Sequence, residues 1–252
     1  MKKRPYISHV LEVRFRRAFA DSDSIESQMN LVYELVRGGA SSDPMLLPDQ
    51  WLIATGEKDS SYLYRAFDSS GPKAAAIAVI REENREETAL QSFTLWNGQE
   101  DRVKGASISC FFDRRDGRSS GLTFKMRSAP QTFRLGDTND AIELVSESVR
   151  LYRPIYSALT PEQYDAVFPD RPGVGWMLYL PRVLTAQQVP EARALVPVMG
   201  KNAKGKDEQR GTIIVSVTDE PFSDENPEHV RIANAIEIRL VDQDLLPRYA
   251  DL

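Results

Sequence analysis

Residues Phe168–Pro181 read FPDRPGVGWMLYLP, and this stretch decides the fold. Pro172 and Pro181 frame it, and two glycines precede an apolar, partly aromatic run. Such a pattern predicts a buried strand that is entered through a tight turn. Trp176 and Tyr179 in this run have two interpretations. We favour a place in the core, the more common position of such runs; an edge strand could instead offer both rings to a partner.

The N-terminal segment alternates in the way a half-buried strand does. Between Ile7 and Phe19 the odd positions Ile7, His9, Leu11, Val13, Phe15 and Phe19 share one face, and mostly polar residues take the other. Asp21–Ser24 then offers helix N-caps, and apolar residues recur at helical spacing from Ile25 until Gly38 and Gly39 end the pattern. A strand followed by an amphipathic helix therefore opens the fold.

Further elements follow from the same rules of spacing, caps and turns. In chain order we expect a strand near Tyr62–Phe67, a helix over 73–83, strands over 90–96, 106–112 and 122–127, a helix from Asp137 to Tyr152, a short helix from Thr160 to Tyr164, a mobile loop over Lys201–Arg210, a strand over Gly211–Thr218 and a helix from Asn226. The strands at 106–112 and 122–127 flank a charged Gly/Ser turn, which predicts an antiparallel hairpin.

The order of these elements predicts an α+β fold. Because the strands in the middle of the chain are consecutive, the sheet is expected to be largely antiparallel or mixed, packed with about five helices. We expect a single domain over residues 1–252, with a division into two lobes near residue 135 as the alternative.

Composition limits the function. The chain has 252 residues, one cysteine and a net charge of -5 from 32 basic and 37 acidic residues. This mild acidity argues against nucleic acid as a partner. A single cysteine gives no disulfide framework, and no segment approaches the ~20 apolar residues of a membrane span. We expect a soluble, cytoplasmic protein with no membrane partner.

The residues that could carry chemistry are isolated from one another. His9, His229 and Cys110 do not have the spacing of a metal site, and a Cys110–His9 dyad would require neighbouring strands. Gly173-Val174-Gly175 lacks the third glycine of a dinucleotide loop, and neither a P-loop nor a GxSxG elbow occurs. We therefore expect no enzyme, no catalytic residues, no metal and no cofactor.

The most acidic segment runs from Asp219 to Glu228 and also has two interpretations. One is a helix N-terminus that favours negative charge, with Ser223, Asp224 or Asn226 as the cap. The other is an acidic loop that meets a basic partner, with Phe222 as an apolar anchor. In the second interpretation the partner-binding residues are Asp219, Glu220, Phe222, Asp224 and Glu225.

Several segments in order resemble the Imm52 family of bacterial immunity proteins. They are VLEVRFRRAF, YRAFDSSGPKAAAIAV, the LWNG element and above all FPDRPGVGWMLYLP, which together extend from about Val10 to Val217. The resemblance implies a non-enzymatic cytoplasmic inhibitor of a cognate toxin. Members are similar in being encoded beside polymorphic toxins, often restriction-endonuclease-like nucleases delivered by type VI secretion.

Two other classes of function stay open. One is a hydrolase that uses scattered carboxylates such as Glu12 or Asp68, because acid–base pairs need not be close in sequence. The other is a structural component of a secretion assembly. The sequence leaves the oligomeric state undecided.

Overall fold

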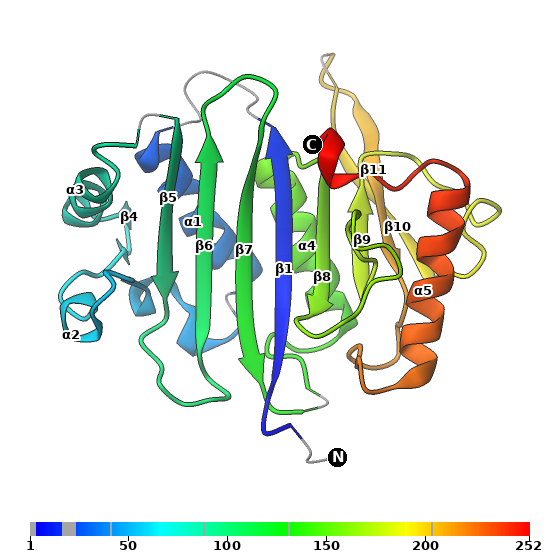
Figure 1. Cartoon of the computed structure of the whole chain (residues 1–252), viewed down its shortest axis with the longest axis horizontal. Helices are drawn as coiled ribbons and strands as arrows, with labels where there is room; N and C mark the ends of the chain where they lie inside the picture. Colours follow the sequence, from blue (N-terminus) through cyan, green and yellow to red (C-terminus); the bar gives the residue numbers. More distant parts are fainter. Residues whose placement is uncertain (1–3, 17–23, 41, 88, 131, 203) are drawn as a thin grey trace.

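One antiparallel sheet of nine strands runs through the part of the chain that the structure describes, in the order β10-β11-β9-β8-β1-β7-β6-β5-β2 (Figure 1). The computed structural model describes residues 4–16, 24–40, 42–87, 89–130, 132–202 and 204–252. The strands of this sheet are β1 (Ile7–Arg16), β2 (Leu52–Ile53), β5 (Leu90–Trp96), β6 (Ala106–Asp113), β7 (Ser119–Ser128), β8 (Tyr156–Pro161), β9 (Met177–Leu180), β10 (Ala194–Lys201) and β11 (Asp207–Val215). The predicted α+β fold with a largely antiparallel sheet is confirmed.

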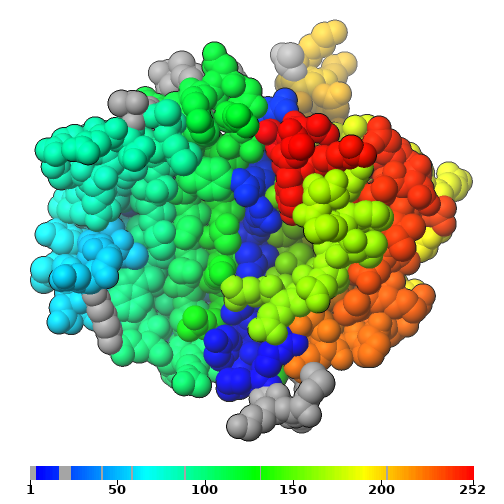
Figure 2. All heavy atoms as spheres, in the orientation of Figure 1, coloured from blue at the N-terminus to red at the C-terminus, as the bar shows by residue number. Residues whose placement is uncertain are grey.

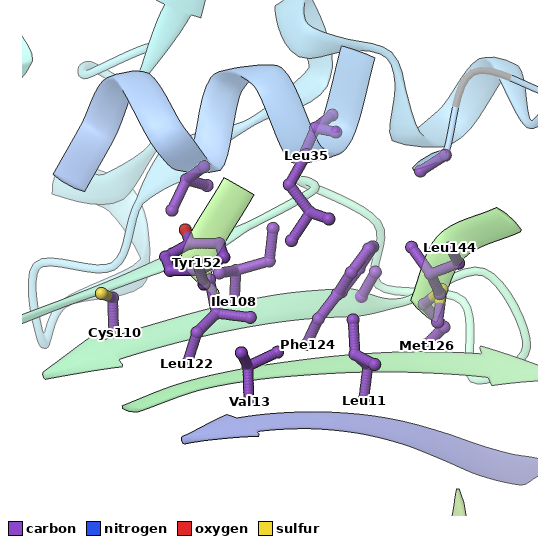
Figure 3. Close-up of a cluster of buried hydrophobic side chains, with 14 of the residues drawn as sticks. Leu11, Val13, Leu35, Ile108, Cys110, Leu122, Phe124, Met126, Leu144 and Tyr152 are labelled. Carbon is purple, nitrogen blue, oxygen red and sulfur yellow. The ribbon is translucent and has the colours of Figure 1, made fainter. Parts of the chain in front are cut away.

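Two long helices cover one face of the sheet. Ser24 caps α1 (Ile25–Gly39) by accepting a hydrogen bond from the Ser27 amide, and Asp137 caps α4 (Thr138–Tyr152). Their apolar sides meet the inward side chains of the central strands (Figure 3). The predicted inward residues of β1 from Ile7 to Phe15 are all buried, and Leu11, Val13 and Phe15 belong to this core. Phe19 and the predicted cap residues Asp21–Asp23 lie outside the described residues.

The third long helix, α5 (Pro227–Asp242), covers part of the opposite face. Its residues Ile232, Ile236 and Leu240, predicted as the inner side of a final helix, join a second apolar cluster with Tyr156 and Leu178 of the sheet. Shorter elements complete the fold: α2 (Lys58–Ser61), α3 (Ala74–Glu83), the small hairpin β3 (Phe67–Asp68) and β4 (Gly71–Pro72), and the 3-10 turns Pro44–Leu46, Pro48–Gln50 and Tyr249–Asp251. Half of this second face thus carries a helix and half does not.

The stretch FPDRPGVGWMLYLP leads into a central strand. β9 lies between β8 and β11, and all of its residues are buried. Trp176 is fully buried and its indole nitrogen donates a hydrogen bond to the Val217 carbonyl at 3.0 Å. Core packing, the favoured interpretation of Trp176 and Tyr179, is therefore confirmed, and the edge-strand alternative is wrong.

The strand expected near Tyr62–Phe67 was wrong for most of its length. The preceding residues form α2, where the amide of Ser61 donates to the Glu57 carbonyl at 3.1 Å, and the chain then turns through Tyr62 and Leu63. Only Phe67 and Asp68 become a strand, paired with β4. Local hydrogen bonds from Ser60 and Ser61 to the Glu57 carbonyl favour the helical turn there.

The short helix expected at Thr160–Tyr164 was also wrong. Thr160 and Pro161 end β8, where they lie opposite Val10 and His9 of β1. The capping pattern is present in the sequence, but pairing with β1 outweighs this local preference. Pro161 fits because the neighbouring Glu162 amide makes the bond to β1, at the Ser8 carbonyl, and β9 pairs with β8 only as far as Leu159. The missing amide of Pro161 therefore removes no hydrogen bond of the sheet.

The expected mobile loop at Lys201–Arg210 is instead largely a hairpin. β10 ends at Lys201 and β11 begins at Asp207, so only a short turn separates them. The sequence did not indicate β10, because Pro197 lies in its middle and prolines normally argue against a strand. β10 is the edge strand of the sheet, where a residue without an amide is tolerated.

The sheet takes strands from both sides of residue 135. β5, β6 and β7 precede that position, β8 to β11 follow it, and β1 lies between the two groups. Hydrogen bonds join β1 to β7 on one side and to β8 on the other. Because the sheet is continuous across residue 135, we propose that the chain is a single domain.

Candidate partner-binding surface

The acidic segment before α5 is partly exposed and partly held in place. Asp219, Glu220 and Glu225 are exposed, whereas Phe222 is only 1% exposed. The Phe222 ring packs between Tyr164, at 5.5 Å between centroids, and His229, at 5.6 Å. Phe222 thus anchors the segment to the protein's own core and offers no exposed apolar contact here.

Ion pairs fix the second part of the segment. Arg4 lies 2.6 Å from Asp224 and 2.8 Å from Glu225, between guanidinium nitrogen and carboxylate oxygen. These carboxylates raise the pKa of Arg4, chiefly through the hydrogen bond to Asp224, although burial opposes the shift. Part of the negative charge in the segment is therefore neutralised from within the chain.

Helix capping, the first interpretation of this segment, is confirmed. The Asn226 side chain accepts a hydrogen bond from the Glu228 amide at 3.0 Å, and Pro227 occupies the first turn of α5. His229 accepts at Nδ1 from the Ser223 amide at 3.1 Å, and its Nε2 lies 3.1 Å from Glu220. The part of the segment before α5 is a defined loop with three exposed carboxylates, Asp219, Glu220 and Glu225.

The two candidate groups for nucleophilic chemistry do not meet. β7 separates β1, which carries His9, from β6, which carries Cys110. Burial raises the pKa of the Cys110 thiol to about 12 and lowers the pKa of His9 to about 4. A thiol that stays protonated is a poor nucleophile. Within the described residues, no three His, Cys, Asp or Glu side chains come together as metal ligands would.

The carboxylates of the hydrolase alternative also lie apart. Glu12 lies on the face of β1 that points away from α1 and α4. Its Oε1 accepts hydrogen bonds from the Tyr156 hydroxyl at 2.8 Å and from Arg14 at 3.1 Å. Asp68 accepts from the Ser70 amide and hydroxyl in the turn between β3 and β4, and these bonds lower its pKa. The two carboxylates therefore belong to separate local networks.

No helix of the described residues covers one half of the sheet on the side of α5, and we call this surface the open face. Figure 2 shows β5 to β7 and β1 at the surface on this side, whereas α5 and the C-terminal segment cover the other half. The open face consists of outward side chains that are exposed or half-buried: Val10, Glu12, Arg14, Thr123, Lys125, Arg127, Ser107, Ser109, Phe111, Ser92, Thr94 and Trp96.

Two aromatic rings interrupt this otherwise polar surface. Arg14 reaches over Gly121 to the ring of Phe111, with 4.7 Å from the guanidinium carbon to the ring centroid. A Cβ at Gly121 would lie 2.6 Å from that ring, so glycine is needed for the contact. Trp96 packs edge-on against Tyr62 at 5.3 Å. Sequence alternation could have indicated Phe111 and Trp96, because both are apolar at outward positions.

Sequence comparison identifies the family. The model of the family described as Immunity protein 52 (Imm52) matches residues 22–248, nearly the whole chain. The chain belongs to the Imm52 family. This confirms the resemblance carried by the FPDRPGVGWMLYLP stretch and the segments around it. Membership in Imm52 supports an immunity role and suggests a non-enzymatic one.

Other comparisons add little to the Imm52 assignment. Comparison with curated proteins finds no match. A solved structure described as the Pseudomonas aeruginosa T6SS protein PA0821 is similar at 13% sequence identity and a TM-score of 0.46. The similarity covers 91% of this chain and 76% of that one. None of the described helices combines the length and apolar character that a membrane-spanning helix requires.

Proposed function

We propose that this Imm52 chain is an immunity protein that binds and neutralises one cognate toxin in the cytoplasm of the cell that produces both. The observation that carries the proposal is the family match over residues 22–248. The separation of Cys110 from His9 and of Glu12 from Asp68 agrees with inhibition by binding.

The toxin we propose is a restriction-endonuclease-like DNase delivered by a type VI secretion system. This choice rests on the family resemblance stated above, and the charge of the chain supports it. A nuclease that binds the DNA backbone presents a basic surface. The net charge of -5 of this chain is complementary to such a surface.

Within this proposal, the acidic segment at Asp219–Glu225 steers the toxin toward the complex. Asp219, Glu220 and Glu225 are the exposed carboxylates, and Asp224 and Phe222 hold the loop that carries them. Exposed charges of this kind act mainly on the association rate, because they attract a partner over distance and are screened by salt.

Co-expression with the cognate toxin, which we expect to be encoded beside this gene, tests the proposal. Cells that make toxin and this chain should grow, and the two proteins should elute together on size exclusion. A toxin variant inactivated at its catalytic residues controls for expression burden. Death of cells that contain soluble immunity chain, with no complex formed, would refute the proposal.

The two alternatives predict different observations. A hydrolase would require converging carboxylates, and Glu12 and Asp68 do not converge. A structural component of a secretion assembly would form oligomers as its concentration rises. Sedimentation velocity across a hundredfold concentration range separates that alternative from a binding module of constant size.

A further inference from the structure

A basic cavity of about 910 Å³ lies between the sheet and the segment that follows α5. Five arginines line it: Arg16, Arg153, Arg171, Arg182 and Arg248. They come from the end of β1, the end of α4, the loop before β9, the loop after β9 and the C-terminal segment. Two aspartates, Asp244 and Asp251, also line the cavity, so positive charge predominates.

The five arginines divide into two groups. Arg16 donates to the backbone carbonyl of Asp251 at 2.8 Å, and the buried Arg171 donates to the carbonyl of Leu246, so these two hold the C-terminal wall. Arg153, Arg182 and Arg248 are exposed and form no ion pair with any described Asp or Glu. Three guanidinium groups are therefore free to bind an anion, which arginine does with paired hydrogen bonds.

The ends of two helices lie at the cavity. Arg153 has φ 44° and Asp244 has φ 52°, and these are the non-glycine residues with left-handed backbone among those described. Both line the cavity. Arg153 is the C-cap of α4 and Asp244 follows the C-cap of α5, and helices commonly end in such a left-handed residue. The ends of these two helices thus bring Arg153 and Asp244 into the wall of the cavity.

The rest of the lining indicates what kind of anion fits. Leu180, Pro181, Leu245 and Pro247 are apolar, and among the described residues no aromatic ring lines this cavity on which a nucleobase could stack. A second hollow of about 500 Å³, which Tyr179 also lines, adjoins it at Arg153, Pro154 and Pro181. We call the two adjoining hollows the groove; their apolar and cationic walls suit an extended peptide better than a compact ion.

We propose that this groove binds an acidic peptide segment in which apolar residues alternate with Asp or Glu, the carboxylates meeting Arg153, Arg182 and Arg248. The inference rests on the proposed function, in which the segment belongs to the toxin. The groove and the acidic segment 219–228 lie at opposite ends of α5, whose 16 residues span roughly 24 Å. The toxin would therefore meet the chain at two oppositely charged places.

The first experiment measures toxin affinity with neutralised groove arginines. The triple variant R153Q/R182Q/R248Q is compared with R85Q/R102Q/R118Q, which removes the same charge from exposed positions elsewhere. We expect the groove variant to weaken binding at least about hundredfold and to flatten the salt dependence, with the control changed less than about threefold. Equal toxin affinity of both triple variants would refute binding of the toxin in the groove and would leave the proposed immunity function intact.

The second experiment does not need the toxin. The chain is titrated with a synthetic decapeptide of alternating Glu and Leu, the same peptide with Gln in place of Glu, and inorganic pyrophosphate, and the melting temperature is followed. The peptide with Glu should raise the melting temperature of the wild type and of the control triple variant, and should not raise that of the groove variant. An equal rise with pyrophosphate would overturn the peptide assignment in favour of a small anion. No rise with either anion would overturn the site itself.

Discussion

The carboxylate of Glu237 on α5 accepts a hydrogen bond from the backbone amide of Val174 at 2.8 Å. It also accepts from the Tyr164 hydroxyl and the Val167 amide, each at 2.7 Å, and is 1% exposed. One buried side chain therefore satisfies three donors of the segment that leads into β9. Within FPDRPGVGWMLYLP, the bond from Val174 ties the turn before β9 to α5.

Replacing Glu237 by Gln should destabilise the fold. Gln keeps one oxygen acceptor but places an NH2 group opposite a donor, and leaving a buried donor unpaired costs about 1–3 kcal/mol. Urea unfolding measures the change. Arg239→Gln is the control on the same helix, because Arg239 is exposed and pairs with Glu191 on the surface.

Burial also raises the pKa of Glu237, against the effect of its three hydrogen bonds. An acid whose pKa is higher in the folded state loses stability as the pH rises from its unfolded value, 4.5, through its folded one. The free energy of unfolding of the wild type should therefore fall as the pH rises above 4.5, and Glu237→Gln should remove part of this fall. Parallel stability curves for wild type and variant across this range would contradict the assignment.

Gly175→Ala should prevent or strongly weaken folding. Gly175 has φ +48°, and a Cβ there would lie 2.3 Å from Cγ2 of Thr160. Gly205→Ala is the matched control, because Gly205 has φ +72° with nothing within 4 Å of the Cβ position, and it should lose only about 1 kcal/mol. Equal losses in thermal melts would mean that the contact with Thr160 carries no energy.

His9→Phe should stabilise the protein in acid. Neither ring nitrogen of His9 has a hydrogen-bond partner among the described residues, and the ring packs against Phe133 at 5.2 Å. Its pKa is about 4 instead of 6.5, chiefly through burial. Stability is therefore kept above pH 6.5 and lost as the pH falls toward 4, by up to about 3 kcal/mol.

The measurement is the difference in unfolding free energy between wild type and His9→Phe at pH 7.5 and at pH 4.5. Asp and Glu titration contributes to both proteins and cancels in the difference. The variant should gain relative to the wild type as the pH falls. A difference that is the same at both pH values would show that His9 does not titrate with folding.

Charge reversal in the acidic segment should slow toxin association. Asp219→Lys together with Glu220→Lys should lower the association rate about tenfold at low salt, with a smaller effect on dissociation. Glu86→Lys with Glu87→Lys is the control of equal charge in the exposed turn that follows α3. The association rate is measured by stopped-flow or surface-based kinetics at two salt concentrations. Equal association rates of the two double variants would show that the acidic segment does not steer the toxin.

Much of the fold could be predicted because its signals are local. The alternation in β1, the caps of α1, α4 and α5 and the hairpin of β6 and β7 each depend on neighbouring residues. The errors arose where distant contacts decide. Thr160 and Pro161 pair with β1 despite a helix-capping pattern, and Pro197 lies on an edge strand that only the assembled sheet reveals.

The candidate site was less predictable. Asp219, Glu220 and Glu225 are exposed as charged residues usually are, but the burial of Phe222 depends on Tyr164 and His229. The groove arginines come from five places between residues 16 and 248 and share no motif. A surface assembled from distant segments leaves no local pattern in a single sequence.

Inhibition of the purified toxin tests the central claim most directly. The toxin's nuclease activity is measured while this chain is added in increasing amounts. We predict that cleavage falls linearly and ends at a fixed molar ratio near one chain per toxin, as tight binding requires. Full cleavage at a tenfold excess of folded chain would contradict the account.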